Sequence, residues 1–164
     1  MERKSIFKLL ALCCLALALS GCAGLPTQGT TAASPSASQT WVAGGAQGRI
    51  NAAVTELTSI TTDFNVAISA GNSGGIAAAG SRYGPVASIF EQESRVCGDA
   101  EMSGYLNTFA SYVRMTGDTV NDINLSFLRL DPSGVTAGAD NLSRINPLLS
   151  AQGTNITTWF ANHK

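Results

Sequence analysis

Charged side chains and histidine are scarce in this 164-residue sequence. Only 13% of the residues are charged, and the one histidine, His163, is the second residue from the end. Chain ends fray, so we expect neither a histidine-based catalytic triad nor a histidine-rich metal site. The glycines at Gly74, Gly75 and Gly80 follow no strand and precede no Gly-Lys-Ser/Thr motif, so they do not predict a phosphate loop. The sequence predicts no cofactor and no metal.

Basic side chains are also few beyond the N-terminus. Residues 1–21 hold three of the ten basic side chains and one of the eleven acidic ones, so residues 22–164 carry a formal charge of −3. A mildly acidic chain lacks the basic surface that binds nucleic acid. We therefore expect no nucleic-acid partner.

Cysteine is absent after residue 22 except at Cys97. In an oxidising compartment such a thiol is buried, is modified or links two copies of the chain. Burial near a helix end is the favoured alternative, and a dimer through Cys97 stays open.

The N-terminus has the layout of an export signal. Three basic residues, Arg3, Lys4 and Lys8, precede an apolar run over residues 9–19. This run is too short to span a bilayer, and a basic start followed by a short apolar run is typical of a secretory signal peptide. The sequence predicts that residues 1–21 are a signal peptide.

The apolar run ends in Leu19-Ser20-Gly21-Cys22, which resembles the lipobox of bacterial lipoproteins. The resemblance implies cleavage before Cys22, acylation of its thiol and a membrane-anchored location in the cell envelope. Ala23 follows the cysteine, where an aspartate would resemble an inner-membrane retention signal. By that family rule, the periplasmic face of the outer membrane is favoured if the source has two membranes.

Residues 22–48 are predicted to form a lipid-anchored flexible linker before a domain at residues 49–164. The segment from residue 23 to residue 48 is rich in Ser, Thr, Ala, Gly and Pro and carries no charge. Such a composition buries too little apolar surface to offset the entropy of ordering. Trp41 is the exception, and we expect it to dock onto the domain in preference to lying at the lipid surface or starting the first helix.

The longest regular apolar pattern lies between residues 102 and 130. Its members recur at alternating steps of four and three, which places them on one face of an α-helix. The spacing predicts a helix from about Asp99 to Leu130, with Tyr105, Tyr112 and Leu128 widening its apolar face. The regular members are Met102, Leu106, Phe109, Val113, Thr116, Val120, Ile123, Phe127 and Leu130.

Three further amphipathic segments accompany this helix. The first is predicted from Arg49 to about Ala70, and the second lies within residues 76–96, with a kink or a helix start near Pro85. The last begins at Pro132, is weakened by Gly134 and Gly138, and is bent or split near Pro147. Four such segments joined by short polar turns predict an all-α fold, an antiparallel four-helix bundle.

Helix ends are marked by capping residues. Cys97-Gly98-Asp99 reads as a helix end followed by a glycine and an N-cap, and Asp131-Pro132 reads as an N-cap followed by the first helical residue.

The function that these features favour is a non-enzymatic envelope protein that binds a protein partner. The prolines at 85 and 147 interrupt regular packing, so we expect Val86, Leu148 or Trp159 to be partly exposed there and to contact the partner.

Two other classes of function stay open. A carrier would hold a small apolar ligand between its helices, using Phe109, Tyr105, Tyr112 and Trp159. A hydrolase would use paired carboxylates, and the candidates are Glu91, Glu93, Asp99, Glu101, Asp118 and Asp122.

Overall fold

The computed structural model describes residues 35–163, which contain five helices and no strand. The predicted signal peptide, Cys22 and the first part of the predicted linker lie outside the described residues. The helices are α2 (Ala37–Ala43), α3 (Ala46–Ser69), α4 (Ser73–Val96), α5 (Ala100–Leu128) and α6 (Pro132–Asn162). The prediction of an all-helical fold is confirmed.

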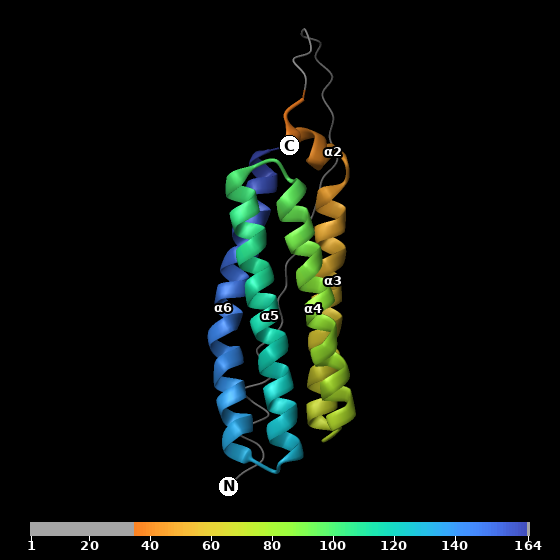
Figure 1. Ribbon diagram of the computed structural model, residues 1–164, viewed down its shortest axis with the longest axis vertical. Coiled ribbons are helices and arrows are strands. Elements are labelled where there is room, and N and C mark those ends of the chain that lie inside the picture. The colour runs from red at the N-terminus through yellow and green to blue at the C-terminus, as the bar shows by residue number, and fades with distance from the viewer. Residues whose placement is uncertain (1–34, 164) are drawn as a thin grey trace.

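The four long helices run side by side along the long axis of the molecule, and α2 lies at one end (Figure 1). Along the chain, α3 packs on α4, α4 on α5, and α5 on α6. We call the end that holds α2, the α4–α5 turn and the last turn of α6 the α2 end. The opposite end holds the α3–α4 turn and the α5–α6 turn, and we call it the distal end.

The predicted caps begin the long helices. The side chain of Asp99 accepts a hydrogen bond from the backbone N–H of Met102 at 2.7 Å, and Asp131 accepts one from Ser133 at 3.0 Å. Pro132 occupies the first turn of α6, where its missing N–H costs nothing. These starts of α5 and α6 confirm the predictions.

The predicted linker is wrong in its second half, which is helical. Ser36 starts α2 with a capping box, in which its hydroxyl accepts from the N–H of Gln39 and the Gln39 side chain accepts from the N–H of Ser36. Trp41 is only 6% exposed, so its predicted docking is confirmed. Helix α3 then begins at Ala46, three residues before the predicted start.

Of the two alternatives expected at each proline, the helix start near Pro85 and the split near Pro147 are wrong. Helix α4 continues through Pro85, and α6 continues through Pro147. A proline inside a helix removes one backbone hydrogen bond, but the residues that follow Pro85 are buried and hold the chain against the neighbouring helices. Packing therefore outweighs the local preference.

The core lies between the long helices and follows the predicted pattern of α5. Most of the regular apolar members of α5 are at most 1% exposed, and Thr116 is buried with its hydroxyl donating to the carbonyl oxygen of Tyr112 at 2.9 Å. Phe109 packs against Phe90 of α4 with ring centroids 4.6 Å apart.

Two glycines allow the helices to approach closely. A Cβ at Gly117 would lie 2.7 Å from the Cβ of Tyr83, and one at Gly138 would lie 2.3 Å from Cγ1 of Ile123. Gly138 was expected to weaken the start of α6, and in the structure its missing side chain leaves the space that Ile123 occupies.

Within residues 35–163, no helix combines the length and the apolar character that crossing a membrane requires.

Candidate functional site

The carboxylates near the start of α5 are engaged by separate groups. Glu91 faces α5, whereas Glu93 faces α2 and α3, so the two side chains on α4 point to different neighbours. Nowhere in residues 35–163 do three or more His, Cys, Asp or Glu side chains form a group able to hold a metal. The partners are Arg114 for Glu91, Arg49 and Trp41 for Glu93, the Met102 N–H for Asp99, and the Tyr105 hydroxyl for Glu101.

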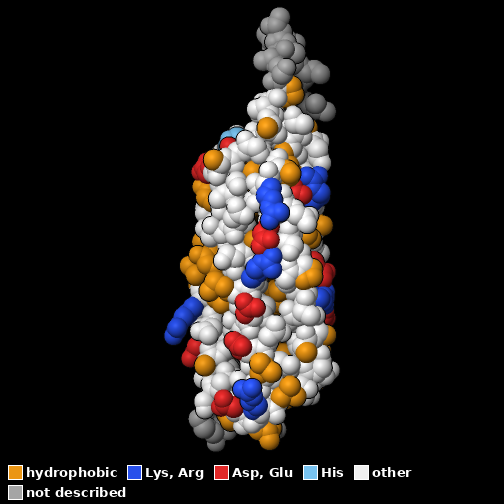
Figure 2. All heavy atoms as spheres, viewed as in Figure 1, with side chains coloured by type: hydrophobic (Ala, Val, Ile, Leu, Met, Phe, Trp, Pro, Cys, Tyr) orange, Lys and Arg blue, Asp and Glu red, His pale blue; other side chains and the backbone are white. Residues whose placement is uncertain are grey.

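Charged side chains of both signs follow one another along one face of the molecule (Figure 2). Arg114 of α5 donates to Glu91 of α4 at 2.8 Å, and Arg95 and Asp118 lie close enough to affect this pair. The hydrogen bond from Arg114 lowers the pKa of Glu91, against the opposing effect of burial. These contacts join α4 to α5 at the surface.

A buried polar cluster at the α2 end is centred on Glu93. Its carboxylate accepts hydrogen bonds from Trp41 Nε1 at 2.7 Å, from Arg49 Nε at 2.6 Å and from Arg49 Nη2 at 3.0 Å. The Glu93 side chain is 9% exposed, whereas that of Arg49 is 46% exposed. The hydrogen bonds from Arg49 lower the pKa of Glu93, burial opposes them, and the Trp41 bond lowers the pKa further.

Aromatic rings surround the same end. Trp41 stacks on Phe160 at 5.5 Å and meets Trp159 edge-on at 5.9 Å. The ring of His163 lies parallel to that of Trp159 at 4.1 Å. Through these contacts α2 is fixed to α6, and through Glu93 it is fixed to α4 and α3. The cluster therefore fixes α2, the first described helix, to the ends of the long helices.

Sequence reasoning did not find the role of Glu93 or Arg49. The signal was present, because Phe90, Glu93 and Cys97 recur at helical spacing on the buried face of α4. A carboxylate in such a row needs a partner, since an unpaired buried charge is costly. The identity of that partner depends on how α3 and α4 pack.

Cys97 lies beside this cluster and is completely buried. Its thiol donates to the carbonyl oxygens of Ser94 and Asp99, both at 3.3 Å. The favoured alternative, burial near a helix end, is confirmed. A disulfide between two copies would require this thiol to leave its site.

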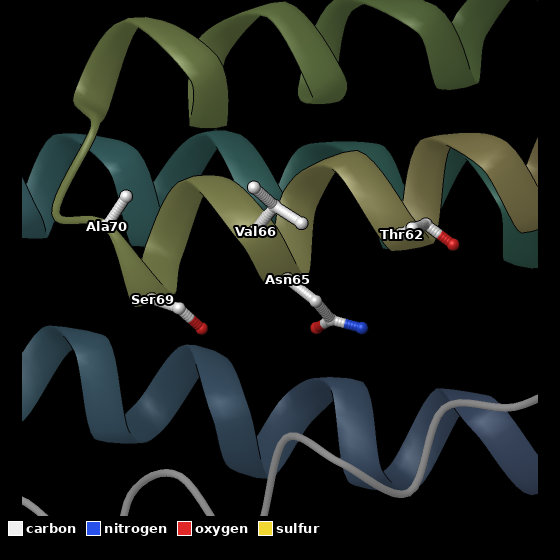
Figure 3. A pocket seen from close by; sticks show the side chains of 5 residues that line it. All are labelled: Thr62, Asn65, Val66, Ser69 and Ala70. Carbon is white, nitrogen blue, oxygen red and sulfur yellow. The ribbon is translucent and has the colours of Figure 1, made fainter.

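A shallow depression lies on the C-terminal part of α3 (Figure 3). Its lining residues come from α3 and its C-cap Ala70, and Asn65 and Ser69 point toward α6. Val66 is 64% exposed, and the side-chain oxygen of Asn65 is buried without a hydrogen-bond partner. The lining residues are Thr62, Asn65, Val66, Ser69 and Ala70.

The rings expected to line a carrier cavity are packed against other side chains instead. Phe109 is fully buried against Phe90, and Trp159 is buried against Trp41 and Phe160. Tyr105 and Tyr112 are partly buried against the core. The arrangement of these rings resembles a packed core.

The residues predicted to contact a partner differ in exposure. Val86 and Trp159 are each 3% exposed, so their expected partial exposure is wrong, because the helices continue through both prolines and pack these side chains inside. Leu148 is 44% exposed, which confirms the expectation for that residue alone.

The distal end exposes more apolar surface than the α2 end. Leu125 is 47% exposed, Leu128 60% and Leu130 88%, and Val66 of α3 lies at the same end. The sequence pattern placed Leu128 and Leu130 on the apolar face, and that prediction is wrong. Apolar and basic side chains lie close together near this end of the molecule (Figure 2).

No protein family model, no curated protein and no solved structure matches this chain.

Proposed function

We propose that this chain is a lipoprotein of the bacterial cell envelope whose helical domain binds a protein partner and performs no chemistry of its own. The lipid anchor is Cys22, and the periplasmic face of the outer membrane is favoured where two membranes exist. The sequence Leu19-Ser20-Gly21-Cys22 after a basic start and an apolar run supports the anchor. Two or three acyl chains would make this attachment effectively permanent.

The observation that carries the binding role is the exposed apolar surface of the distal end. There, Leu125, Leu128 and Leu130 expose between 47% and 88% of their surface, whereas the apolar side chains earlier in α5 are buried in the core. Contiguous exposed apolar groups mark interaction sites more often than single ones. A tethered domain meets other envelope proteins at raised effective concentration, so a modest interface suffices.

We also propose that the four long helices form an antiparallel four-helix bundle, as the sequence predicts. The contacts of α4 with α3 and of α5 with both α4 and α6 support this arrangement, and so do the short turns between them. The buried apolar side chains of α6, such as Ile145 and Ile156, support a shared core.

Substituting the anchor residue tests the location. Cys22→Ser is expected to abolish incorporation of labelled palmitate and to move the protein out of the membrane fraction, because serine offers no thiol for acylation. Labelling and fractionation of both forms in the producing cell give the measurement. If the variant keeps its label and stays in the membrane fraction, the lipoprotein assignment is wrong.

Photo-crosslinking in the producing cell tests the function. A benzoylphenylalanine placed in turn at exposed positions on every long helix is expected to capture one specific envelope protein. Purification of the unmodified chain should yield no bound compound. A domain that purifies with a stoichiometric apolar small molecule and captures no protein would favour the carrier instead.

A further inference from the structure

Helix α2, at one end of the molecule (Figure 1), is attached to the fold mainly by one side chain. Of its seven residues only Trp41 is buried, and Val42 is partly buried against the core. The other residues of α2 are exposed or partly exposed. A helix this short is not stable in water by itself. The helix therefore depends on the contacts that Trp41 makes with the rest of the chain.

The site that receives Trp41, which we call the seat, is built by the long helices. The ring of Phe160 stacks on Trp41 at 5.5 Å, and that of Trp159 meets it edge-on at 5.9 Å. Glu93 accepts the hydrogen bond from the Trp41 indole N–H at 2.7 Å and is itself held by Arg49 at 2.6 Å. All the residues of the seat belong to α3, α4 and α6. The seat therefore keeps its shape as long as these helices stay folded.

The turn between α4 and α5 touches the start of α2. Gly98 has a φ of +66°, and a Cβ at this position would lie 2.4 Å from the Cβ of Ala37 and 3.2 Å from the backbone nitrogen of Ser38. These groups are small, whereas a tryptophan side chain buries roughly 150–250 Å². The contact positions the start of α2, and Trp41 supplies most of the buried area.

Two glycines form the hinge between α2 and α3. Gly44 is close to helical, with a φ of −74° and a ψ of 12°, and its N–H donates to the carbonyl oxygen of Thr40 at 2.9 Å. Gly45 has a left-handed φ of +78°, which glycine adopts freely. Helical bonding resumes at once, because the N–H of Arg49 donates to the carbonyl oxygen of Gly45 at 3.2 Å. Rotation about Gly45 is enough to move α2 without changing α3.

One side-chain bond crosses this hinge. Nη1 of Arg49 donates to the carbonyl oxygen of Gly44 at 2.5 Å. This bond is exposed, so water replaces it at little cost when the hinge turns.

We infer that α2 is a strap that opens as a unit while the four long helices stay folded. In the closed state Trp41 covers the rings of Trp159 and Phe160 and takes up an oxygen of Glu93. Opening turns this seat toward the solvent. Segments held by few buried contacts open at a lower free energy than the core of a domain. The strap therefore switches the α2 end between a closed and an aromatic surface, whether or not the domain binds a protein partner.

Opening of the strap and unfolding of the domain expose very different areas. Opening exposes one large side chain, whereas unfolding exposes the whole core, including Phe109 and Ile123. The sensitivity of an equilibrium to denaturant scales with the surface that becomes exposed. Strap opening is therefore expected to depend little on urea. A substitution in the core affects the closed and open states equally and leaves their ratio unchanged.

Hydrogen exchange measures the opening directly in the full-length, ¹⁵N-labelled chain in detergent micelles. The indole N–H of Trp41 reports on the seat, the backbone N–H of Gly44 reports on α2, and the backbone N–H of Phe109 reports on the long helices. The protection factors of Trp41 and Gly44 are expected to agree within about threefold. Both are expected to lie at least about a hundredfold below that of Phe109.

Urea and a distant core substitution separate the two processes. Urea below the unfolding transition is expected to raise exchange at Phe109 at least about tenfold and to change it at Trp41 less than twofold. Ile123→Ala, near the distal end, is expected to have the same two effects, because Ile123 is 1% exposed and its truncation destabilises the core alone. The urea series uses the unmodified chain, so it decides the question even if the variant does not fold.

Hinge variants test the role of Gly45. Gly45→Ala is expected to raise exchange at Trp41 at least about fivefold, because the left-handed conformation is strained for alanine and opening releases that strain. Gly45→Asn is expected to change it less, because asparagine tolerates this conformation. Gly48→Ala is the matched control, since it adds the same methyl group within α3, where nothing lies within 4 Å. Its effect on Trp41 exchange is expected to be less than twofold.

Three results would overturn the inference. If the Trp41 indole N–H exchanges as slowly as the Phe109 amide and rises with urea in parallel, α2 opens only when the whole domain unfolds. If it exchanges while the Gly44 amide stays protected as strongly as that of Phe109, the ring leaves the seat without the helix. If Gly45→Ala and Gly48→Ala change the exchange of Trp41 equally, the strap has no hinge at Gly45.

Discussion

Phe109→Ala is expected to lower the free energy of unfolding by about 3–5 kcal/mol. Phe109 is completely buried in the middle of α5, and its ring lies 4.6 Å from that of Phe90. Truncation removes the transfer free energy of the ring and leaves a cavity that α4 and α5 cannot fill, because close contacts such as that of Gly117 with Tyr83 fix their separation.

Chemical denaturation of residues 35–164, followed by far-ultraviolet circular dichroism, measures this effect. The midpoint is expected to fall while the slope of the transition is kept. Phe127→Ala is the matched control, because Phe127 is on the same helix but only partly buried, and its effect should be clearly smaller. An unchanged midpoint for Phe109→Ala contradicts its place in the core, and a spectrum typical of strands contradicts the fold.

The regular spacing of α5 predicted its buried face because helical periodicity depends on local geometry alone. The prediction holds from Met102 to Ile123, where neighbouring helices cover that face. It fails at Leu128 and Leu130, because α5 ends at Leu128 and Leu130 belongs to the turn. A pattern identifies residues that share a face only as long as the helix continues, and it does not show where the covering helix stops.

The second half of the predicted linker is helical because of contacts with distant residues, which its composition does not reveal. Trp41 contributes its ring to a cluster with Trp159 and Phe160, residues more than a hundred positions away. The Ser36–Gln39 capping box was a local signal for this helix, since each of the two side chains accepts a hydrogen bond from the backbone N–H of the other residue. Contacts between distant segments then made a short, weakly predicted helix stable.

Caps and prolines show the same division between local and distant effects. Asp99 and Asp131 were predicted correctly because a cap needs only the neighbouring backbone. Pro85 and Pro147 were expected to kink or break helices, and the helices do not break there, because the residues on both sides of each proline pack against neighbouring helices. The exposure of Leu130 at the distal end was missed because it depends on which helices surround that residue.

Glu93→Ala is expected to lower the free energy of unfolding by about 2–3 kcal/mol at neutral pH, mainly because the buried N–H of Trp41 is left without its acceptor. Arg49 also loses the acceptor of two hydrogen bonds that connect α3 to α4. Arg49 can turn to water because it is 46% exposed, so the loss stays below that of a fully buried ion pair.

The Glu93→Gln variant separates the charge from the shape of the side chain. The pKa of Glu93 is lowered in the folded chain, mainly by the hydrogen bonds from Arg49. Its carboxylate therefore stabilises the fold at pH values above the unfolded pKa of about 4.3, and this contribution is lost as the pH falls through the lower folded pKa. The difference in stability between wild type and Glu93→Gln is expected to be largest near neutral pH and to shrink below about pH 4.

Denaturation midpoints of wild type and Glu93→Gln between pH 3 and pH 7 measure this difference. Glu91→Gln is the control, because the pKa of Glu91 is also lowered but Glu91 pairs with Arg114 at the surface, where water and salt screen the charges. Its difference from wild type should be smaller and should fall with added salt. A deficit of Glu93→Gln that stays constant across this pH range would show that shape, and not the ion pair with Arg49, holds α2 and α3 to α4.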